Sequence, residues 1–565
     1  MPLRALLIAA TLLTPVTAAA QNVAGPYLAA RIAGFGNDYD AAADYYATLL
    51  RADNVPADVL ESALVVYGAL GRFDEGVTFA DRMTLAGGPS RFATGIRMVD
   101  ALLNERYDRA SALLLDGDGV GGALLDGMLD GWLAVAQGDP DAADERFDAL
   151  AETPSYASFA RQQQAYALAL AGEYAAADDI LAGRTHGPLP ANVRAVEAHA
   201  QILAELDRPD DALELLEEIA AQANNPVLRD MQARLEAGEE IGWDFITTPR
   251  EGLAEAYFTL AAILAGETSP TFTLVNAQAA AALRPDHVDA LVLIGGLFDE
   301  QEQYDLADAV LGRVPADHPS FFGAEIERAE VLLASDREDA AVEVLRSLSR
   351  AHPDEIVVWT ALGDALRRLD RFALAADAYD QAVELLEEPG PRDWFLFYAR
   401  AIARERMGRF DQAEPDFRRA LELNPEQPLV LNYLGYSLVE ARRDLDEALG
   451  MIERAVEARP DDGFITDSLG WVLYRLGRYE EAVAPMERAV QLEPLDPIIN
   501  DHFGDVLWTV GREREARFQW RRALSLDPEE DEVARIRRKL DVGLDVVLAE
   551  EAAEDEAGDD GAATE

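Results

Sequence analysis

A period of 34 residues constrains the fold of this chain more than any other feature. Its clearest copy spans residues 463–494, where two amphipathic helical patterns flank a turn at Gly477. A unit of two helices cannot bury its own apolar face, so it needs neighbouring copies on both sides. The sequence therefore predicts a stack of helical hairpins rather than a single globular core.

Copies of this unit recur before and after it at the same interval. The pair Leu469-Gly470 has counterparts at Leu434-Gly435 and at Phe503-Gly504. The pattern resembles the tetratricopeptide repeat family, whose unit reads W-x2-L-G-x2-Y, then A-x3-F, then P. This resemblance implies an all-α, right-handed solenoid in which the first helices of the hairpins line a concave groove.

A small residue near the start of each second helix marks the successive hairpins. The markers predict about 14 hairpins, six before and eight after a break in the period. They are Ala42, Gly76, Ala110, Ala143, Ala177 and Ala212 before the break, and Thr273, Ala307, Ala341, Ala375, Ala413, Ala448, Ala482 and Ala516 after it.

The break and the chain ends define the expected domains. Residues 21–232 form a divergent first array, 233–253 an irregular joint, and 254–528 a second array. Trp243 and Phe245 in the joint are expected to fill a seam rather than to bind a ligand. Residues 529–549 should form one charged capping helix, and the acidic tail 550–565 should be disordered.

The N-terminal segment has the pattern of a cleaved signal peptide at residues 1–20. An apolar run over residues 5–13 is ended by Pro15 and followed by small residues at 18–20. No later stretch is long and apolar enough to predict a transmembrane span. Cysteine is absent, which excludes disulfides and a lipidated cysteine. The expected localisation is therefore periplasmic or secreted.

The formal net charge of −56 restricts the partners. Nucleic acid is excluded as a partner, because binding it requires Lys and Arg to replace counterions. Neutral or basic proteins and peptides are favoured, although the acidity is equally explained as a device for solubility.

No catalytic, cofactor or metal site is expected. Residues 117–122 match G-x-G-x-x-G, but no strand or βαβ pattern surrounds them. The six histidines are isolated, and no two share a helix face with metal-ligand spacing. The sequence therefore argues against an enzyme; a site at the joint is the place where an unrecognised activity would lie.

A stripe of aromatic and polar residues on four successive first helices is the candidate partner-binding groove. Residues three or four apart on a helix share a face, and this face differs from the packing face. Aromatic side chains there would supply contact area and the acids would bind basic groups. The open alternative is that the aromatics pack between neighbouring first helices. The stripe consists of Tyr398, Asn432, Tyr436, Asp467, Trp471, Tyr474, Asp501, Asp505 and Trp508.

The second half also resembles the bacterial repeat lipoprotein that partners a carboxyl-terminal processing protease, through the sequences at 432–436 and 467–471. That resemblance implies an exported, non-enzymatic adaptor that delivers envelope substrates to the protease. The alternative is a carbohydrate-binding protein of envelope polysaccharide export, in which Tyr436, Trp471, Tyr474 and Trp508 stack on sugar rings.

Overall fold

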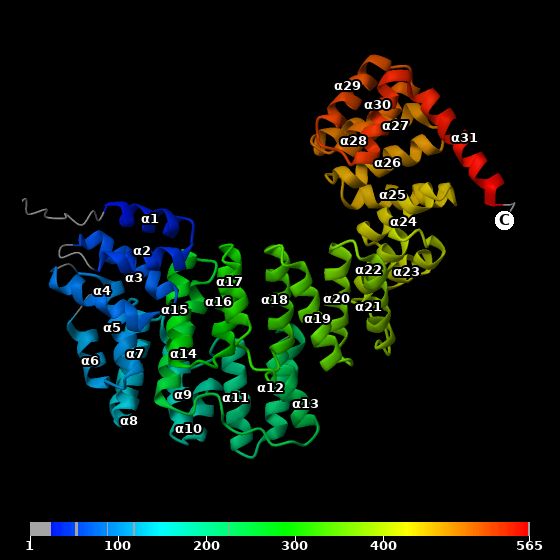
Figure 1. Cartoon of the computed structure of the whole chain (residues 1–565). Coiled ribbons are helices and arrows are strands. Elements are labelled where there is room, and N and C mark those ends of the chain that lie inside the picture. Colours follow the sequence, from blue (N-terminus) through cyan, green and yellow to red (C-terminus); the bar gives the residue numbers. More distant parts are fainter. Residues whose placement is uncertain (1–23, 51–54, 87–88, 117–118, 224, 563–565) are drawn as a thin grey trace, which may run out of the picture. The chain divides into compact units, whose positions relative to one another are not determined.

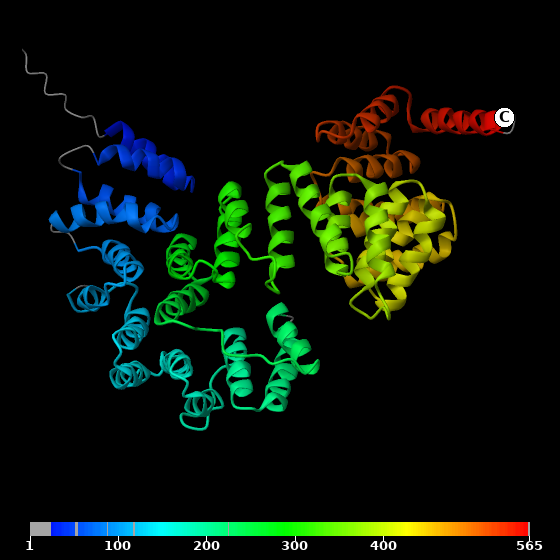
Figure 2. The same ribbon diagram turned by 60° about the horizontal axis from the view of Figure 1, so that its bottom comes forward.

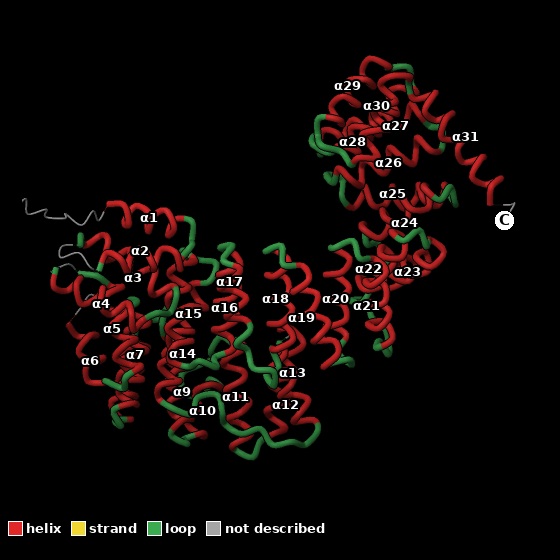
Figure 3. The backbone as a smooth tube through the Cα atoms, in the orientation of Figure 1, coloured by secondary structure: helices red, strands yellow, loops and turns green. Residues whose placement is uncertain are grey.

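The structure, a computed structural model, describes residues 24–50, 55–86, 89–116, 119–223 and 225–562. The described residues form 31 helices and contain no strand (Figure 3). None of these helices is both long and apolar enough to cross a bilayer. The expected signal peptide at residues 1–20 lies outside the described residues.

The chain divides into two compact units, Met1–Ala341 and Val342–Glu565, and α19 (Glu338–Ala351) crosses the boundary (Figure 1). The first unit contains α1 (Ala24–Phe35), α2 (Tyr39–Leu49), α3 (Ala57–Ala69), α4 (Phe73–Leu85), α5 (Arg91–Leu103), α6 (Tyr107–Asp116), α7 (Ala123–Ala136), α8 (Pro140–Ala151), α9 (Ala157–Leu170), α10 (Tyr174–Leu181), α11 (Val193–Glu205), α12 (Pro209–Ala223), α13 (Pro226–Glu236), α14 (Pro249–Leu264), α15 (Pro270–Leu283), α16 (Val288–Glu300), α17 (Tyr304–Leu311) and α18 (Phe321–Ala334). The second contains α20 (Ile356–Arg368), α21 (Phe372–Glu384), α22 (Trp394–Arg406), α23 (Phe410–Leu423), α24 (Pro428–Glu440), α25 (Leu445–Ala458), α26 (Gly463–Arg475), α27 (Tyr479–Leu492), α28 (Pro497–Thr509), α29 (Glu513–Leu524), α30 (Glu530–Val542) and α31 (Leu544–Ala562).

The hairpin is built as the sequence predicts. Gly477 has φ +76° and ends α26, and the Arg478 N–H donates to the Leu473 carbonyl at 2.9 Å. Within α26, a Cβ on Gly470 would lie 2.6 Å from Met486 of α27, so glycine is what lets the two helices approach. The marker residues all lie on second helices, and the described residues form the 14 expected hairpins, six of them before the joint.

In the first unit, the second array does not simply continue the first. The first helices of neighbouring hairpins contact one another (α3 with α5, α7 with α9) and form an inner wall. After the joint the chain turns back, and α14 packs on α7 and α9 while α15 packs on α3 and α5 (Figure 2). The concave face of the first array is thus filled by the chain's own helices.

Close backbone approach fixes this arrangement. A Cβ on Gly252 of α14 would lie 2.3 Å from the Trp132 ring of α7. A Cβ on Gly68 of α3 would lie 3.2 Å from Val275 of α15, and the Gln278 amide donates to the Ala69 carbonyl at 3.1 Å. Side chains of this density leave no room for a bound peptide between these helices.

The irregular segment between α13 and α14 covers residues 237–248, inside the first unit. Phe245 and Ile246 are buried in the unit's core, and the Trp243 indole donates to the Ile246 carbonyl at 2.6 Å. Both aromatics pack on other aromatic rings, Phe245 on Tyr166 and Trp243 on Tyr174. They fill the seam where the chain turns back.

The C-terminal end differs from the expectation in two ways. The expected single capping helix is two helices, because Gly543 has φ +89° and breaks the segment between α30 and α31. The acidic tail, expected to be disordered, continues α31 to Ala562. Its abundance of Ala and Glu explains the helix, since both residues have high helix propensity.

Candidate functional site

The predicted stripe lies on α22, α24, α26 and α28 of the second unit, one part on each first helix. These helices form the inner wall of the unit, since α24 contacts α26 and α26 contacts α28. The structure therefore places the stripe residues of α24, α26 and α28 on first helices that contact one another. Most of the stripe's side chains, however, are buried or half-buried.

The acids at the end of the stripe are buried and already paired. The Lys539 ammonium of α30 is fully buried and lies 2.6 Å from Asp501 and 2.7 Å from both carboxylate oxygens of Asp505. The Arg535 guanidinium lies 3.6 Å from both acids. Burial and the neighbouring Asp505 charge raise the pKa of Asp501. The expectation that these acids await a basic ligand is wrong: the single lysine of the chain occupies them.

The next acid, Asp467, is also buried and paired. Its carboxylate lies 2.9 Å from Nδ1 of His502 on α28. Burial alone would lower the pKa of His502, but the charge of Asp467 and its hydrogen bond raise it. This pair joins the inner faces of α26 and α28.

The tryptophans of the stripe are packed rather than free. Trp471 stacks on Tyr474, at 5.0 Å, and on His502, at 4.0 Å, and its indole donates to Glu440 at 2.7 Å. Trp508 packs on Trp520 at 5.3 Å, and a Cβ on Gly543 would lie 2.6 Å from it. The expected exposed aromatic stripe is therefore wrong for Trp471, which is buried, and Trp508 is half-buried.

The remaining members are half-buried. Tyr398 packs on Phe417 at 6.1 Å and on Tyr433 at 6.0 Å, and burial raises the pKa of Tyr436. Oδ1 of Asn432 is buried without a protein hydrogen-bond partner. Over most of the stripe, the side chains therefore pack between first helices, which is the alternative to an open groove.

The exposed residues of this face were missed by the sequence reasoning. They form an apolar row, one residue near the start of each first helix, defined as Val357, Phe395, Leu429, Phe464 and Ile498. Phe464 lies three residues before Asp467, so it shares the face of the stripe. Four members are 40–56% exposed, and Leu429 is half-buried. Their intervals of 38, 34, 35 and 34 residues follow the repeat, which was the available signal.

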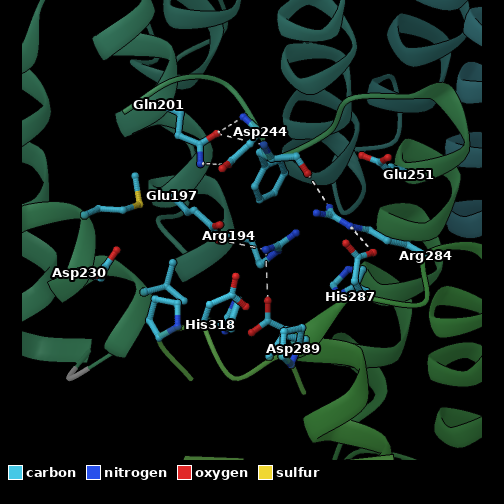
Figure 4. Close-up of a pocket in the computed structure, with 18 of the residues that line it drawn as sticks. Arg194, Glu197, Gln201, Asp230, Asp244, Glu251, Arg284, His287, Asp289 and His318 are labelled. Atoms are coloured by element: carbon cyan, nitrogen blue, oxygen red, sulfur yellow. Dashed lines mark hydrogen bonds and ion pairs between the residues drawn. The ribbon is translucent and has the colours of Figure 1, made fainter. Parts of the chain in front are cut away.

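The first unit has a pocket of about 450 Å³ at the joint (Figure 4). Arg194 of α11 lies at its centre, 2.6 Å from Glu255 of α14 and 3.2 Å from Asp289. His287 lies 3.2 Å from the same Glu255 carboxylate. The Arg194 guanidinium also stacks on the Phe245 ring at 4.1 Å. These contacts tie the first array, the joint and the returning helices together.

The charges of this pocket compensate one another. Burial alone would raise the pKa of Glu255, but Arg194 and His287 hold it well below its usual value. Burial raises the pKa of Glu197 to about 7, against the opposing charge of Arg194. The Gln201 side chain accepts from the Asp244 and Phe245 N–H groups at 3.0 and 3.1 Å and fixes the joint. These contacts account for the pocket's charged residues as partners that hold the helices together. In the described part of the chain, no cluster of three or more acidic or histidine side chains could hold a metal.

A third surface is the exposed face of α1. Leu28, Ile32 and Phe35 recur at helical spacing and are more than half exposed. A contiguous apolar helix face on the surface marks a protein contact more often than chance exposure does.

Taken together, a stack of helical hairpins with an inner wall of first helices defines the class of protein: an α-solenoid of the kind that binds other proteins. The chain contains tetratricopeptide repeats, since the model of that family matches residues 326–391, 398–463 and 440–497.

Several known proteins resemble parts of the chain. The TPR repeat-containing protein PA4667 of Pseudomonas aeruginosa is 31% identical over 28% of this chain and 26% of its own length. Protein FlbA of Caulobacter vibrioides is 26% identical over 50% of this chain and 45% of its own. The general transcriptional corepressor ssn6 of Schizosaccharomyces pombe is 26% identical over 29% of this chain and 16% of its own. The chain thus spans less than half of each of these relatives.

Solved structures resemble the chain at lower identity. The Cut9-Hcn1 hetero-tetramer of the APC/C is 14% identical, with coverage of 93% of this chain and 97% of the other and a TM-score of 0.38. A tetratricopeptide repeat protein from Parabacteroides merdae is 16% identical, with coverage of 44% and 96% and a TM-score of 0.37.

Proposed function

We propose that this protein is an exported, non-enzymatic adaptor that binds protein partners through two separate surfaces. One is the concave face of the second unit, and the other is the exposed face of α1. The observation that carries the proposal is the apolar row: consecutive repeats present exposed apolar side chains on one face of their first helices. Large apolar side chains repeated on a solvent-facing surface are a typical feature of protein-binding sites.

The concave face of the first array is not part of the proposal. The helices α14 and α15 occupy it, so a partner of the first unit must bind elsewhere. The exposed side chains of Leu28, Ile32 and Phe35 are suited to that role. An adaptor with one site in each unit holds two different proteins at once, which raises their effective concentration for each other.

The specific role that we propose is delivery of envelope substrates to a carboxyl-terminal processing protease. It rests on the resemblance of the second half to the adaptor of such a protease and on the signal-peptide pattern of residues 1–20. The strongly acidic composition supports neutral or basic partners.

The test is affinity capture from the organism's own envelope extract with three baits. They are the chain from residue 21 onward, the same chain with Leu28→Asp and Ile32→Asp, and the same chain with Phe464→Asp and Ile498→Asp. We expect quantitative mass spectrometry to find a protease lost only from the α1 variant and substrates lost only from the second variant. Identical sets of proteins on all three baits would contradict the proposal.

A further inference from the structure

The acidic residues around the apolar row repeat with it. An acid stands two residues before Val357, Phe395, Phe464 and Ile498, at the N-terminal end of the same helix. Leu429 has Gln427 at that place and Glu426 one residue earlier. The starts of these first helices therefore carry acidic residues close in sequence to the exposed apolar ones. The acids are Glu355, Asp393, Asp462 and Asp496.

These acids differ from the buried acids of the inner wall. Asp462 and Asp496 cap their helices by accepting the N–H groups of Ile465 at 3.1 Å and Ile499 at 2.8 Å. Both carboxylates are partly exposed, and that of Asp462 also lies 3.9 Å from Arg459. Asp501 and Asp505, by contrast, already share the cations of Lys539 and Arg535. The acids that a basic partner can reach on this face are therefore the partly exposed ones beside the apolar row.

The spacing of the row selects the conformation of an occupant. Neighbouring packed helices lie about 8–10 Å apart, so successive row residues repeat at about that distance. A helix rises about 10.5 Å in seven residues and brings the same face round again. An extended strand brings its same face round every two residues, at about 6.6 Å, which does not match.

We infer that the apolar row binds an amphipathic, basic helix of a partner protein, with an apolar side chain at every seventh position and Arg or Lys beside it. The three first helices α24, α26 and α28 contact one another in order and form its centre. Leu429, Phe464 and Ile498 receive the apolar side chains, and Asp462 and Asp496 receive the basic ones. This inference rests on the proposed function, because it names the kind of segment that the concave face of the second unit binds.

The test uses the whole chain from residue 21 onward and synthetic fluorescent peptides of about 21 residues, long enough for three heptads. The first peptide has Leu at every seventh position and Arg on the flanking positions. A second has the same composition with the Leu spacing scrambled, a third has Glu for Arg, and a fourth has a central Pro that prevents a helix. Binding is measured by fluorescence anisotropy, and helix formation by circular dichroism.

We expect the first peptide to bind and each of the other three to bind at least about tenfold more weakly. The protein variant with Phe464→Asp and Ile498→Asp should lose about tenfold or more in affinity for the first peptide. The matched control is Leu85→Asp, which puts the same charge on an exposed leucine of the first unit, and it should bind as the unmodified chain does. Unchanged circular dichroism spectra and melting would show that the variants are folded.

Equal binding of the first and scrambled peptides, or of the unmodified chain and the double variant, would overturn the inference. So would equal binding of the proline peptide, since the occupant would then not be a helix. Failure of the proposed function is distinguishable: the double variant would then capture the same envelope proteins as the unmodified chain, whatever the peptides do. If substrates are lost from that variant but the first peptide does not bind, the adaptor function stands and the amphipathic helix is wrong.

Discussion

The two units use the same hairpin but treat the inner face of their first helices differently. In the first unit the inner face of α3, α5, α7 and α9 is covered by α14 and α15, which come from the same chain. In the second unit the inner face is closed at its middle by side chains of neighbouring first helices and at its end by α30. Only near the helix starts does it present exposed apolar side chains. A solenoid face can therefore be a core in one place and a surface in another.

In both units, buried charged residues join helices that are far apart in the sequence. Arg194, Glu255 and His287 join the first array to the returning helices, and Lys539 joins α30 to α28. A buried ion pair contributes little net stability, because desolvation offsets its Coulomb energy, but it strongly penalises arrangements that leave one charge alone. Each cluster thus specifies which helices meet.

The largest expected effect is in the first unit. Glu255→Ala leaves the Arg194 cation buried without its main partner and should lower the free energy of unfolding by about 3–5 kcal/mol. The control is Asp305→Ala, which removes one of the two carboxylates paired with Arg337 at the surface and should change stability far less. Urea denaturation of the full chain, followed by circular dichroism, measures both; equal losses would contradict the importance of the buried cluster.

The corresponding change in the second unit is Lys539→Met. It leaves the buried Asp501 and Asp505 with only the Arg535 guanidinium, which lies 3.6 Å from each, and we expect a loss of about 3 kcal/mol in the second unit alone. Arg538→Met, one residue earlier, removes an exposed pair with Glu550 and should leave the second unit's melting unchanged. Differential scanning calorimetry separates the units, and a loss confined to the first unit would refute the role given to Lys539.

A smaller effect is expected from packing. Gly252→Ala places a methyl group against the Trp132 ring and should destabilise the first unit by about 1–3 kcal/mol. Gly323→Ala, on α18 of the same unit, meets open space and should be neutral or slightly stabilising. If both substitutions had the same effect on the melting temperature, α14 would not lie against α7.

The smallest effect is the pH dependence that Glu255 and His502 contribute to stability, which has opposite sign for the two groups. The pKa of Glu255 is lowered, so its contribution to stability is present above the unfolded value of about 4.3 and is lost as pH falls. The pKa of His502 is raised, so its contribution is present below about 6.5 and is lost as pH rises through the folded value. Calorimetry between pH 3 and 9 should show the Glu255 contribution to the first unit being lost at the acid end and the His502 contribution to the second unit being lost as pH rises. His502→Gln should flatten the second unit's slope.

The sequence predicted what is local and repeated. Gly477 predicts the turn of one hairpin, and Gly470 predicts the close contact between its two helices. Similar signals recur along the chain, so 14 hairpins could be predicted. Periodicity cannot reveal that α14 and α15 turn back into the first array, because every hairpin has the same apolar pattern whichever neighbour it packs against. The break in the repeat period at the joint was the one sequence signal for where the chain turns back.

The candidate site was predicted less well, for a related reason. Asp467, Asp501 and Asp505 look like surface acids on a helix, and their partners, His502 and Lys539, lie 34 to 38 residues away. A sequence pattern read one helix at a time does not show such pairing. Phe464 and Ile498 were not predicted, because apolar residues on a helix are usually buried and only their solvent exposure in the fold distinguishes them.

Thiol reactivity tests the difference between the two inner faces most directly, because the chain has no cysteine of its own. Gln278→Cys reports the face of α15 that meets α3, and Phe464→Cys reports the apolar row. In the folded full chain, we predict that a water-soluble thiol reagent labels Phe464→Cys at a rate within about tenfold of the rate in the unfolded chain. Gln278→Cys should be labelled only when the first unit opens. Rapid labelling at Gln278→Cys, or protection at Phe464→Cys, would contradict a first inner face that is closed and a second that is open.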